Sequence, residues 1–301
     1  AATDEQEVGV LLIETTLSGG AGAGTGFVID EDGTVVTNYH VVDGSTDIQV
    51  TVASTGETYA ASVVGWNEAA DIAVLELEGD PDLATIELDD DGVEVGEAVT
   101  TIGNSNGQGY LSVDSGSITG LEESITTTDE LTGGGNDLTG LLVNDVYAVP
   151  GDSGGPLVDD EGEVVGVTTA TTSGGATRSY AVPIEDALDI VDQIESGQET
   201  STTRIGPGAY LGISVSTAAG QGTTGAGATV ASVAEGGPAA AAGIGEGAGI
   251  TAIDGERIDD VDDLTGTVSD HEPGESVTVT WIDASGAEQS ATLTLGESPL
   301  A

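Results

Sequence analysis

The chain has 301 residues and a formal net charge of −51, with three arginines, no lysine, no cysteine and two histidines. Without lysine there is no phosphate-binding P-loop and no Schiff-base site, and without cysteine there is no thiol nucleophile, disulfide or cysteine-zinc site. Such a negative charge argues against nucleic acids and anionic membrane surfaces as partners. No cofactor is expected.

The first chemically informative residue is His40, near the end of an apolar run. Residues 35–42 read Val-Val-Thr-Asn-Tyr-His-Val-Val, which is typical of the end of a buried strand. The other histidine, His271, lies in the polar stretch 269–274 and is predicted to be a solvated loop residue. His40 is therefore the candidate catalytic base.

Asp71 stands out among 54 acidic residues by its context. It opens the stretch Asp-Ile-Ala-Val-Leu, and a carboxylate at the mouth of a buried strand needs a partner. We therefore take Asp71 as the acid that orients the imidazole of His40. Residues 87–92 hint at a calcium loop, but its twelfth position is Ala98, so the bidentate acid is missing. A solvated turn and no metal site are expected there.

The most informative segment is the hexapeptide Gly-Asp-Ser-Gly-Gly-Pro at residues 151–156. A serine hydroxyl is a poor nucleophile unless a base takes its proton, so this loop must present Ser153 outward. It must also aim backbone N–H groups at the oxyanion that forms on attack, and the glycines allow the sharp turn that this requires. The chain order His40, Asp71, Ser153 is that of chymotrypsin, and it predicts a Ser-His-Asp triad.

The second half of the chain changes character twice. Apolar residues recur with helical spacing over residues 184–194, which predicts an amphipathic helix, and residues 196–208 are polar and glycine-rich, which indicates a linker. Residues 275–295 alternate as two strands would. Many short alternating strands predict a mainly β protein. The expected domains are residues 1–195 and 209–297.

These segments resemble the HtrA (Deg) family of trypsin-fold serine proteases that carry PDZ domains, and the resemblance covers nearly the whole chain. It implies a chymotrypsin-like double β-barrel followed by a small α+β PDZ domain. Residues 24–29 resemble the first barrel strand of the family. The other motifs in the protease half are residues 37–42, 71–75, 101–105, 113–118, 150–158, 162–167 and 179–184.

The resemblance extends to a carboxylate-binding loop at residues 209–215. It makes Tyr210, Leu211, Gly212 and Ile213 the candidate peptide-binding residues. In such loops a peptide C-terminus pairs with a strand edge while backbone N–H groups hold its carboxylate. A PDZ domain that binds no peptide is the alternative. The short helix, hairpin and groove helix of the family correspond to residues 237–244, 253–258 and 261–268.

The resemblance also implies that the N–H groups of Gly151 and Ser153 form the oxyanion hole. The chain departs from the family at Asp152, where asparagine is usual. Tyr147 stands six residues before Ser153, where an aspartate would favour basic residues at the P1 position of a substrate. A small or apolar P1 residue is implied, although Tyr147 bears on the depth of the pocket.

We expect a serine endopeptidase that degrades unfolded or damaged proteins and recognises peptide C-termini through its PDZ domain. The first alternative is a non-proteolytic chaperone or adaptor that binds exposed C-termini through the PDZ groove. The second alternative is an esterase on the same fold.

The charge and the ends of the chain suggest where the protein works. An excess of carboxylates without lysine is typical of haloarchaeal proteins, because the Debye length of about 3 Å in molar salt screens their repulsion. The chain has no methionine and no apolar span of about 18 residues, so we expect an extracellular or cell-surface protein after removal of an export signal. Family members often form trimers through N-terminal contacts, and residues 8–13 are the apolar patch for a homotrimer.

Overall fold

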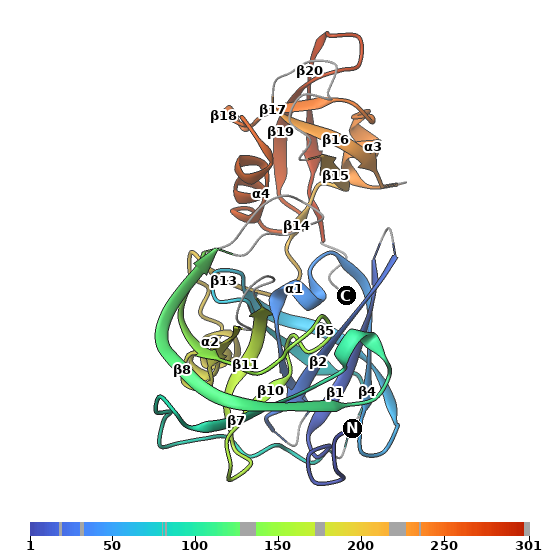
Figure 1. Cartoon of the computed structure of the whole chain (residues 1–301). Coiled ribbons are helices and arrows are strands. Elements are labelled where there is room, and N and C mark those ends of the chain that lie inside the picture. Colours follow the sequence, from blue (N-terminus) through green and yellow to red (C-terminus); the bar gives the residue numbers. More distant parts are fainter. Residues whose placement is uncertain are drawn as a thin grey trace. The chain divides into compact units, whose positions relative to one another are not determined.

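Short strands with one buried face dominate the chain, as the alternating pattern predicts. In the computed structural model the described residues up to 206 form one compact unit, and those from 207 to 297 form another (Figure 1). The structure describes residues 1–17, 20–30, 33–79, 81, 83–126, 137–171, 178–216, 227–234 and 236–297.

The first six strands close into a β-barrel because β5 pairs with both β4 and β6. Around the barrel the order is β5-β4-β1-β2-β3-β6, and β13 adds to the free side of β5. These strands are coloured blue to cyan in Figure 1, apart from β13. Their bounds are β1 (Val10–Leu17), β2 (Gly20–Val28), β3 (Thr34–Thr37), β4 (Ser45–Val52), β5 (Thr58–Asn67), β6 (Ile72–Leu77) and β13 (Thr203–Ile205).

Strand β1 corrects two expectations about the N-terminal segment. It is the first strand of the barrel, whereas residues 24–29, which the resemblance assigned to that role, lie at the end of β2 and just beyond it. β1 runs between β2 and β4, and the apolar side chains expected to form a trimer surface are buried in two core clusters instead. Leu11 and Ile13 pack in the core of the first barrel, and Val10 and Leu12 pack in a cluster that also holds residues of the second barrel. Only Val8 of that run is exposed, at 40%, while the buried residues are Val10, Leu11, Leu12 and Ile13.

The next six strands form a second closed barrel, in the order β7-β8-β9-β12-β11-β10. The short helix α1 lies between β3 and β4, and the 3-10 helix η1 lies in the loop after β7. A longer helix, α2, follows β12. That longer helix confirms the predicted amphipathic helix, and it buries Ile184, Ala187 and Ile194. The bounds are β7 (Ala98–Gly103), β8 (Ser112–Thr126), β9 (Asp137–Asn144), β10 (Pro156–Val158), β11 (Val164–Thr171), β12 (Ser179–Pro183), α1 (Tyr39–Val42), η1 (Ser105–Gly107) and α2 (Ile184–Glu195).

The segment expected to be a linker is partly folded onto the first barrel. Thr203 lies opposite Asn67 in the pairing of β13 with β5. The Asn67 amide also donates to the Thr203 hydroxyl at 3.0 Å. A β-branched pair at residues 203 and 205 suits a strand, and this tertiary pairing overrides the polar local composition. The first unit therefore extends to residue 206.

The second unit is built around a sheet with the order β15-β16-β17-β19-β20, to which β18 adds beside β17. A separate pair joins β14 to β21. The short helix, the hairpin and the groove helix expected from the sequence are present as α3, β17–β18 and α4. No helix in the described part of the chain has the length and hydropathy to span a bilayer. The bounds are β14 (Ala209–Tyr210), β15 (Ile213–Ser216), β16 (Ala228–Val233), β17 (Gly249–Ile253), β18 (Glu256–Arg257), β19 (Ser276–Ile282), β20 (Glu288–Thr294), β21 (Gly296–Glu297), α3 (Pro238–Ala242) and α4 (Val261–Ser269).

Candidate active site

The pairing of β3 with β6 brings the candidate base and acid together. The two strands are antiparallel neighbours with Thr37 opposite Ala73, so the chain that leaves β3 runs beside the chain that enters β6. His40 lies in α1, just after β3, and Asp71 directly precedes β6. Both side chains therefore come from one edge of the first barrel.

The carboxylate of Asp71 accepts hydrogen bonds from two residues. Nδ1 of His40 lies 2.8 Å from Oδ2, and the backbone N–H of His40 donates to Oδ1 at 3.0 Å. The hydroxyl of Thr169 also donates to Oδ2. Asp71 is only 6% exposed, so these donors offset the cost of burying its charge. Because Nδ1 faces Asp71, Nε2 is the ring nitrogen that can act on a nucleophile.

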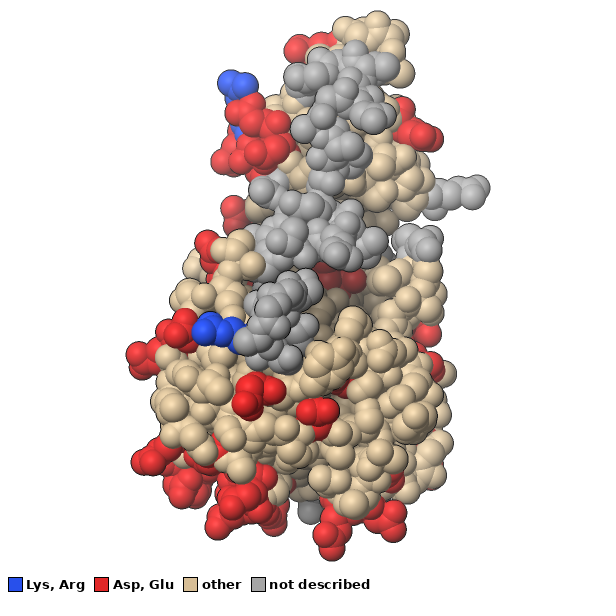
Figure 2. Space-filling view, in the orientation of Figure 1, with Lys and Arg blue, Asp and Glu red and all other residues tan. Residues whose placement is uncertain are grey.

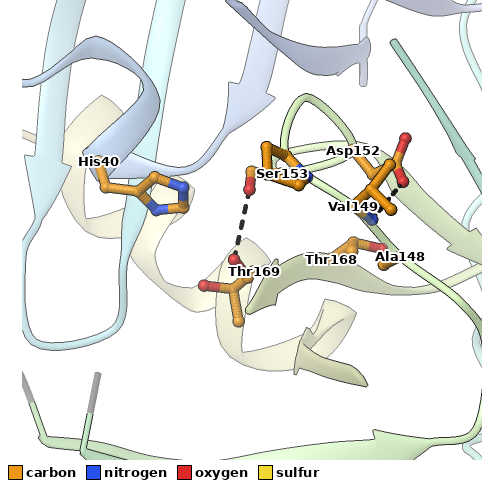
Figure 3. Close-up of a pocket in the computed structure, with 8 residues that line it drawn as sticks. His40, Ala148, Val149, Asp152, Ser153, Thr168 and Thr169 are labelled. Atoms are coloured by element: carbon orange, nitrogen blue, oxygen red, sulfur yellow. Dashed lines mark hydrogen bonds between the residues drawn. The ribbon is translucent and has the colours of Figure 1, made fainter. Parts of the chain in front are cut away.

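Ser153 belongs to the second barrel, in the loop between β9 and β10, and Thr25 of β2 ties this loop to the first barrel. The Thr25 N–H donates to the Ser153 carbonyl at 2.9 Å, and its hydroxyl donates to the Gly151 carbonyl at 2.7 Å. The Ser153 hydroxyl donates to the Thr169 carbonyl at 3.4 Å. Figure 3 shows the His40 ring and the Ser153 side chain across one pocket, with the hydroxyl turned towards Thr169.

Two N–H groups of this loop point away from internal acceptors. Within the described part of the chain, nothing accepts a hydrogen bond from the N–H of Gly151 or Ser153. The Pro150 carbonyl accepts the N–H of Asn106 at 2.6 Å. Gly151 adopts a φ of +96°, and a Cβ atom there would lie 2.2 Å from the carbonyl oxygen of Asn104, so only glycine can occupy this position.

The pocket beside Ser153 has small and apolar walls. Tyr147 does not line it, because its side chain is 64% exposed, and so it does not set the depth of the pocket. The residues with polar side chains in the lining are His40, Asp152, Ser153 and two threonines. The full lining is His40, Ala148, Val149, Pro150, Asp152, Ser153, Thr168 and Thr169.

Asp152 directly precedes Ser153, the candidate nucleophile, and is 2% exposed. Its Oδ1 accepts the hydroxyl of Ser105 at 2.7 Å, and its Oδ2 accepts the N–H of Val149 at 2.8 Å. Burial raises the pKa of this carboxyl above its usual value, while the two hydrogen bonds oppose the rise and the charge of Asp114 adds to it. The residue that departs from the family pattern is thus a buried, hydrogen-bonded acid.

Sequence reasoning missed Thr169 and Ser105. Thr169 lies in the apolar strand β11, and a polar residue buried in such a strand signals a polar partner elsewhere in the fold. No comparable signal marks Ser105, which lies in a polar loop.

His271 lies in the loop after α4, as expected, and is partly exposed. Its side chain is 23% exposed, and its Nδ1 lies 2.8 Å from Oε2 of Glu275. Its N–H donates to the Val268 carbonyl in the last turn of α4 at 3.1 Å.

Among the described residues, one group of three carboxylates is close enough together to hold a cation: Asp89, Asp159 and Glu163. Backbone N–H groups already occupy much of it, because Asp159 Oδ1 accepts three of them and Asp89 accepts that of Gly92. Burial and the charge of Asp159 raise the pKa of Glu163. Asp89 is buried rather than solvated, at 8% exposure. A cluster of acids on a turn does not by itself make a metal site.

The four candidate peptide-binding residues link β14 to β15. Gly212 adopts a φ of +78°, which lets the chain turn between the two strands. The Leu211 carbonyl accepts the N–H of Ala239 and the Gly212 carbonyl that of Ala234, each at 2.9 Å. In the described part of the chain nothing accepts the N–H of Leu211 or Gly212. The loop thus presents two backbone donors, while Tyr210 and Ile213 lie in the flanking strands.

Comparison with known proteins supports both halves. Residues 24–167 match the trypsin-like peptidase domain and residues 209–295 match the PDZ domain. A probable periplasmic serine endoprotease of the DegP-like type from Halomonas elongata is 31% identical, over 92% of this chain and 56% of the relative. The serine protease PepD of Mycobacterium tuberculosis is 30% identical, over 96% of this chain and 64% of the relative. The chain thus spans only part of the length of these curated relatives.

Solved structures give the same result. The HtrA-type protease AlgW with a tripeptide superimposes with a TM-score of 0.55 at 27% identity, over 98% of this chain and 97% of that one. A serine endoprotease from Yersinia pestis shares the fold, with a TM-score of 0.55 at 23% identity, over 99% of this chain and 98% of that one. With a double β-barrel of the trypsin type followed by a PDZ domain, the chain belongs to the HtrA (Deg) family of serine proteases.

Proposed function

We propose that the chain is a serine endopeptidase in which His40, Asp71 and Ser153 form the catalytic triad. The observation that carries this proposal is the bond of 2.8 Å between His40 Nδ1 and Asp71, beside a serine in the same pocket. Asp71 orients the ring, and Nε2 of His40 takes the proton of the Ser153 hydroxyl as its oxygen attacks the scissile carbonyl. His40 then gives that proton to the leaving amine, and water hydrolyses the acyl-enzyme.

The N–H groups of Gly151 and Ser153 are the proposed oxyanion hole. Their lack of internal acceptors among the described residues supports this role, because preorganised donors stabilise charge that develops in the transition state. The Ser153 hydroxyl must leave the Thr169 carbonyl to reach His40. That bond is long, at 3.4 Å, so rotation of the side chain towards His40 costs little.

Unfolded or damaged proteins are the proposed substrates. The small and apolar residues of the pocket lining support a small or apolar P1 residue, since the carboxylate of Asp152 is 2% exposed and is bonded to Ser105 and Val149. The PDZ domain is proposed to bind peptide C-termini at the loop of residues 210–213. The two unoccupied donors of Leu211 and Gly212 support this role, because backbone N–H groups are what hold a terminal carboxylate.

The setting proposed for the enzyme is salty and outside the cytoplasm. Figure 2 shows carboxylates spread over the visible face, which supports adaptation to high salt. Relatives named periplasmic support export, with an extracellular or cell-surface location as the finer proposal. A homotrimer would need a surface other than β1, and light scattering in molar KCl tests for it.

Degradation of casein by the wild type and by Ser153→Ala tests the proposal, in molar KCl and in dilute buffer. We expect cleavage by the wild type alone, and only in high salt. Cleavage that survives Ser153→Ala would refute the triad. Holdase activity without cleavage in either protein would favour the chaperone or adaptor, and turnover of small esters without peptide cleavage would favour the esterase.

A further inference from the structure

We infer that Ser105 is a positioning residue that acts through Asp152 to hold the oxyanion-hole donors in place. The inference rests on the proposed function, because it concerns how the loop of residues 149–153 keeps its shape. It assigns a task to the acid at position 152, which is where the chain departs from its family.

The buried carboxylate of Asp152 depends on its hydrogen-bond donors. The carboxylate is 2% exposed, and among the described residues no arginine, histidine or chain terminus lies within 4.0 Å of it. A buried charge without a cation depends on hydrogen bonds. Each oxygen has one donor, with Oδ1 at 2.7 Å from the Ser105 hydroxyl and Oδ2 at 2.8 Å from the Val149 N–H. Removing Ser105 would leave Oδ1 without its side-chain donor.

The Asn106 backbone determines the direction in which the Gly151 N–H points. A trans peptide places its C=O and N–H on opposite sides, so the Pro150 carbonyl determines where the Gly151 N–H is aimed. The Asn106 N–H holds that carbonyl at 2.6 Å. The Gly151 N–H is thereby directed away from the η1 loop, on the side where an oxyanion would bind.

Ser105 and Asn106 bind the nucleophile loop, residues 149–153, from adjacent positions in the sequence. The Asn106 N–H holds the Pro150 carbonyl and the Ser105 hydroxyl holds the Asp152 side chain, so both residues that flank Gly151 are bonded to the same loop. Loss of the Ser105 bond would let Asp152 move. The peptide before Ser153, which carries the second donor of the hole, would move with it.

The Ser105 hydroxyl is itself oriented. Its oxygen also contacts the hydroxyl of Ser112 in β8, and Ser112 accepts the side-chain amide of Gln108 at 3.0 Å. The Asp152 carboxylate only accepts, so the Ser105 hydroxyl donates to it and accepts from Ser112. The other acceptor within reach of the Ser112 hydroxyl is the Gly103 carbonyl, at the longer distance of 3.5 Å. The chain of donors therefore runs in one direction, from Gln108 to the carboxylate.

The test uses the full chain in molar KCl, with a fluorogenic peptide copied from a casein site that the wild type cleaves. Ser105→Ala should lower kcat by about tenfold and leave KM unchanged, a smaller loss than the 10²–10³-fold that follows removal of a donor itself. A peptide boronate, whose adduct places an oxygen in the hole, should bind more weakly by the same factor. The peptide amide of the same sequence, which forms no covalent adduct, should bind as it does to the wild type.

Two further variants separate positioning from folding. Asp152→Asn should keep a higher kcat than Asp152→Ala, because the amide oxygen can accept from Val149 and the NH2 group can donate to Ser105. Ser105 then donates to Ser112, whose own proton can turn to the Gly103 carbonyl at 3.5 Å. Ser115→Ala is the matched control. The Ser115 hydroxyl, on β8, makes an exposed hydrogen bond of 3.0 Å to Thr100 of β7 and does not contact the nucleophile loop. It should leave kcat and boronate affinity unchanged.

The outcomes are distinct. A folded Ser105→Ala with wild-type kcat and boronate affinity overturns the inference while the proposed function stands. Asp152→Asn as impaired as Asp152→Ala also overturns it, because then the charge and not the pair of contacts is what matters. Absence of Ser153-dependent cleavage in the wild type overturns the proposed function and this inference with it.

Discussion

The side-chain amide of Asn38 donates a hydrogen bond of 2.8 Å to the main-chain carbonyl of Asp71. Asn38 is fully buried, and Asp71 adopts a φ of +56°, a left-handed conformation that is costly for a residue with a side chain. The β3–β6 ladder ends at Thr37 and Ala73, so no strand partner serves this carbonyl. The Asn38 amide therefore stabilises the main-chain conformation from which the Asp71 carboxylate reaches His40.

Replacing Asn38 by alanine should lower both stability and activity. The buried carbonyl of Asp71 would lose its donor, which costs about 1–3 kcal/mol of the free energy of unfolding. Denaturant unfolding in molar KCl measures this loss, and kcat/KM should fall because the carboxylate shifts away from His40. Gln49→Ala, which removes an exposed amide from β4, is the control. Equal unfolding midpoints for the two variants would contradict the assigned role.

Replacing Thr169 by valine should impair catalysis with little change in shape. The valine keeps the volume but removes the hydroxyl that donates to Asp71. A hydrogen bond to a charged group contributes about 1.5–3 kcal/mol, so kcat/KM should fall by about 10–100-fold. Thr58→Val, on the exposed pair with Thr51, should have no effect on the same assay. Wild-type kcat/KM in Thr169→Val would mean that Asp71 does not need this donor.

Asp152 should make stability depend on pH in an unusual direction. Burial raises its pKa in the folded state, so the folded protein binds this proton more tightly than the unfolded chain does. Its contribution to stability is therefore greatest at low pH, and it is lost as pH rises from the ordinary value through the raised one. Asp152→Asn should unfold at a higher temperature than the wild type at pH 7. The difference should narrow as the pH falls, and a difference that stays constant with pH would refute the assignment.

The net charge of −51 predicts a strong salt requirement. Raising KCl from 0.1 M to 1 M shortens the Debye length from about 10 Å to about 3 Å and screens the repulsion between carboxylates. Each kcal/mol that screening adds to the free energy of unfolding raises the melting temperature by about 2–4 °C in a domain of the size of the first unit. Thermal unfolding followed by circular dichroism measures the effect. Replacing the exposed residues Glu122 and Glu123 by glutamine should make the melting temperature depend less steeply on the KCl concentration. A melting temperature independent of KCl would show that repulsion between carboxylates is negligible.

The elements of the fold were readable from local patterns. Helix α2 follows from the spacing of its apolar residues, and the strands follow from alternation and from glycine turns. Strand β13 was not predictable, because its residues lie in a polar segment and become a strand only by pairing with β5. The burial of β1 shows the same limit, since an apolar run fits a core strand and a surface patch equally well.

The site divides in a similar way. His40, Asp71 and Ser153 each carry a local context that selects them. The residues that support them do not, because Thr169 meets Asp71 across 98 positions of sequence and Ser105 meets Asp152 across 47. No local pattern encodes such contacts, which depend on how the barrel strands are closed. The left-handed φ of Asp71 could not be predicted either, because the Asn38 hydrogen bond that accompanies it is formed only in the folded chain.

The loop that carries Ser153 is fastened to β2 by Thr25, whose N–H and hydroxyl hold two carbonyls of that loop. The proposed base and acid belong to one barrel and the proposed nucleophile belongs to the other, so they can meet only when the two barrels are docked. A chain with a single folded barrel would therefore lack the proposed triad. Proteolytic activity is expected to appear only after both barrels have folded.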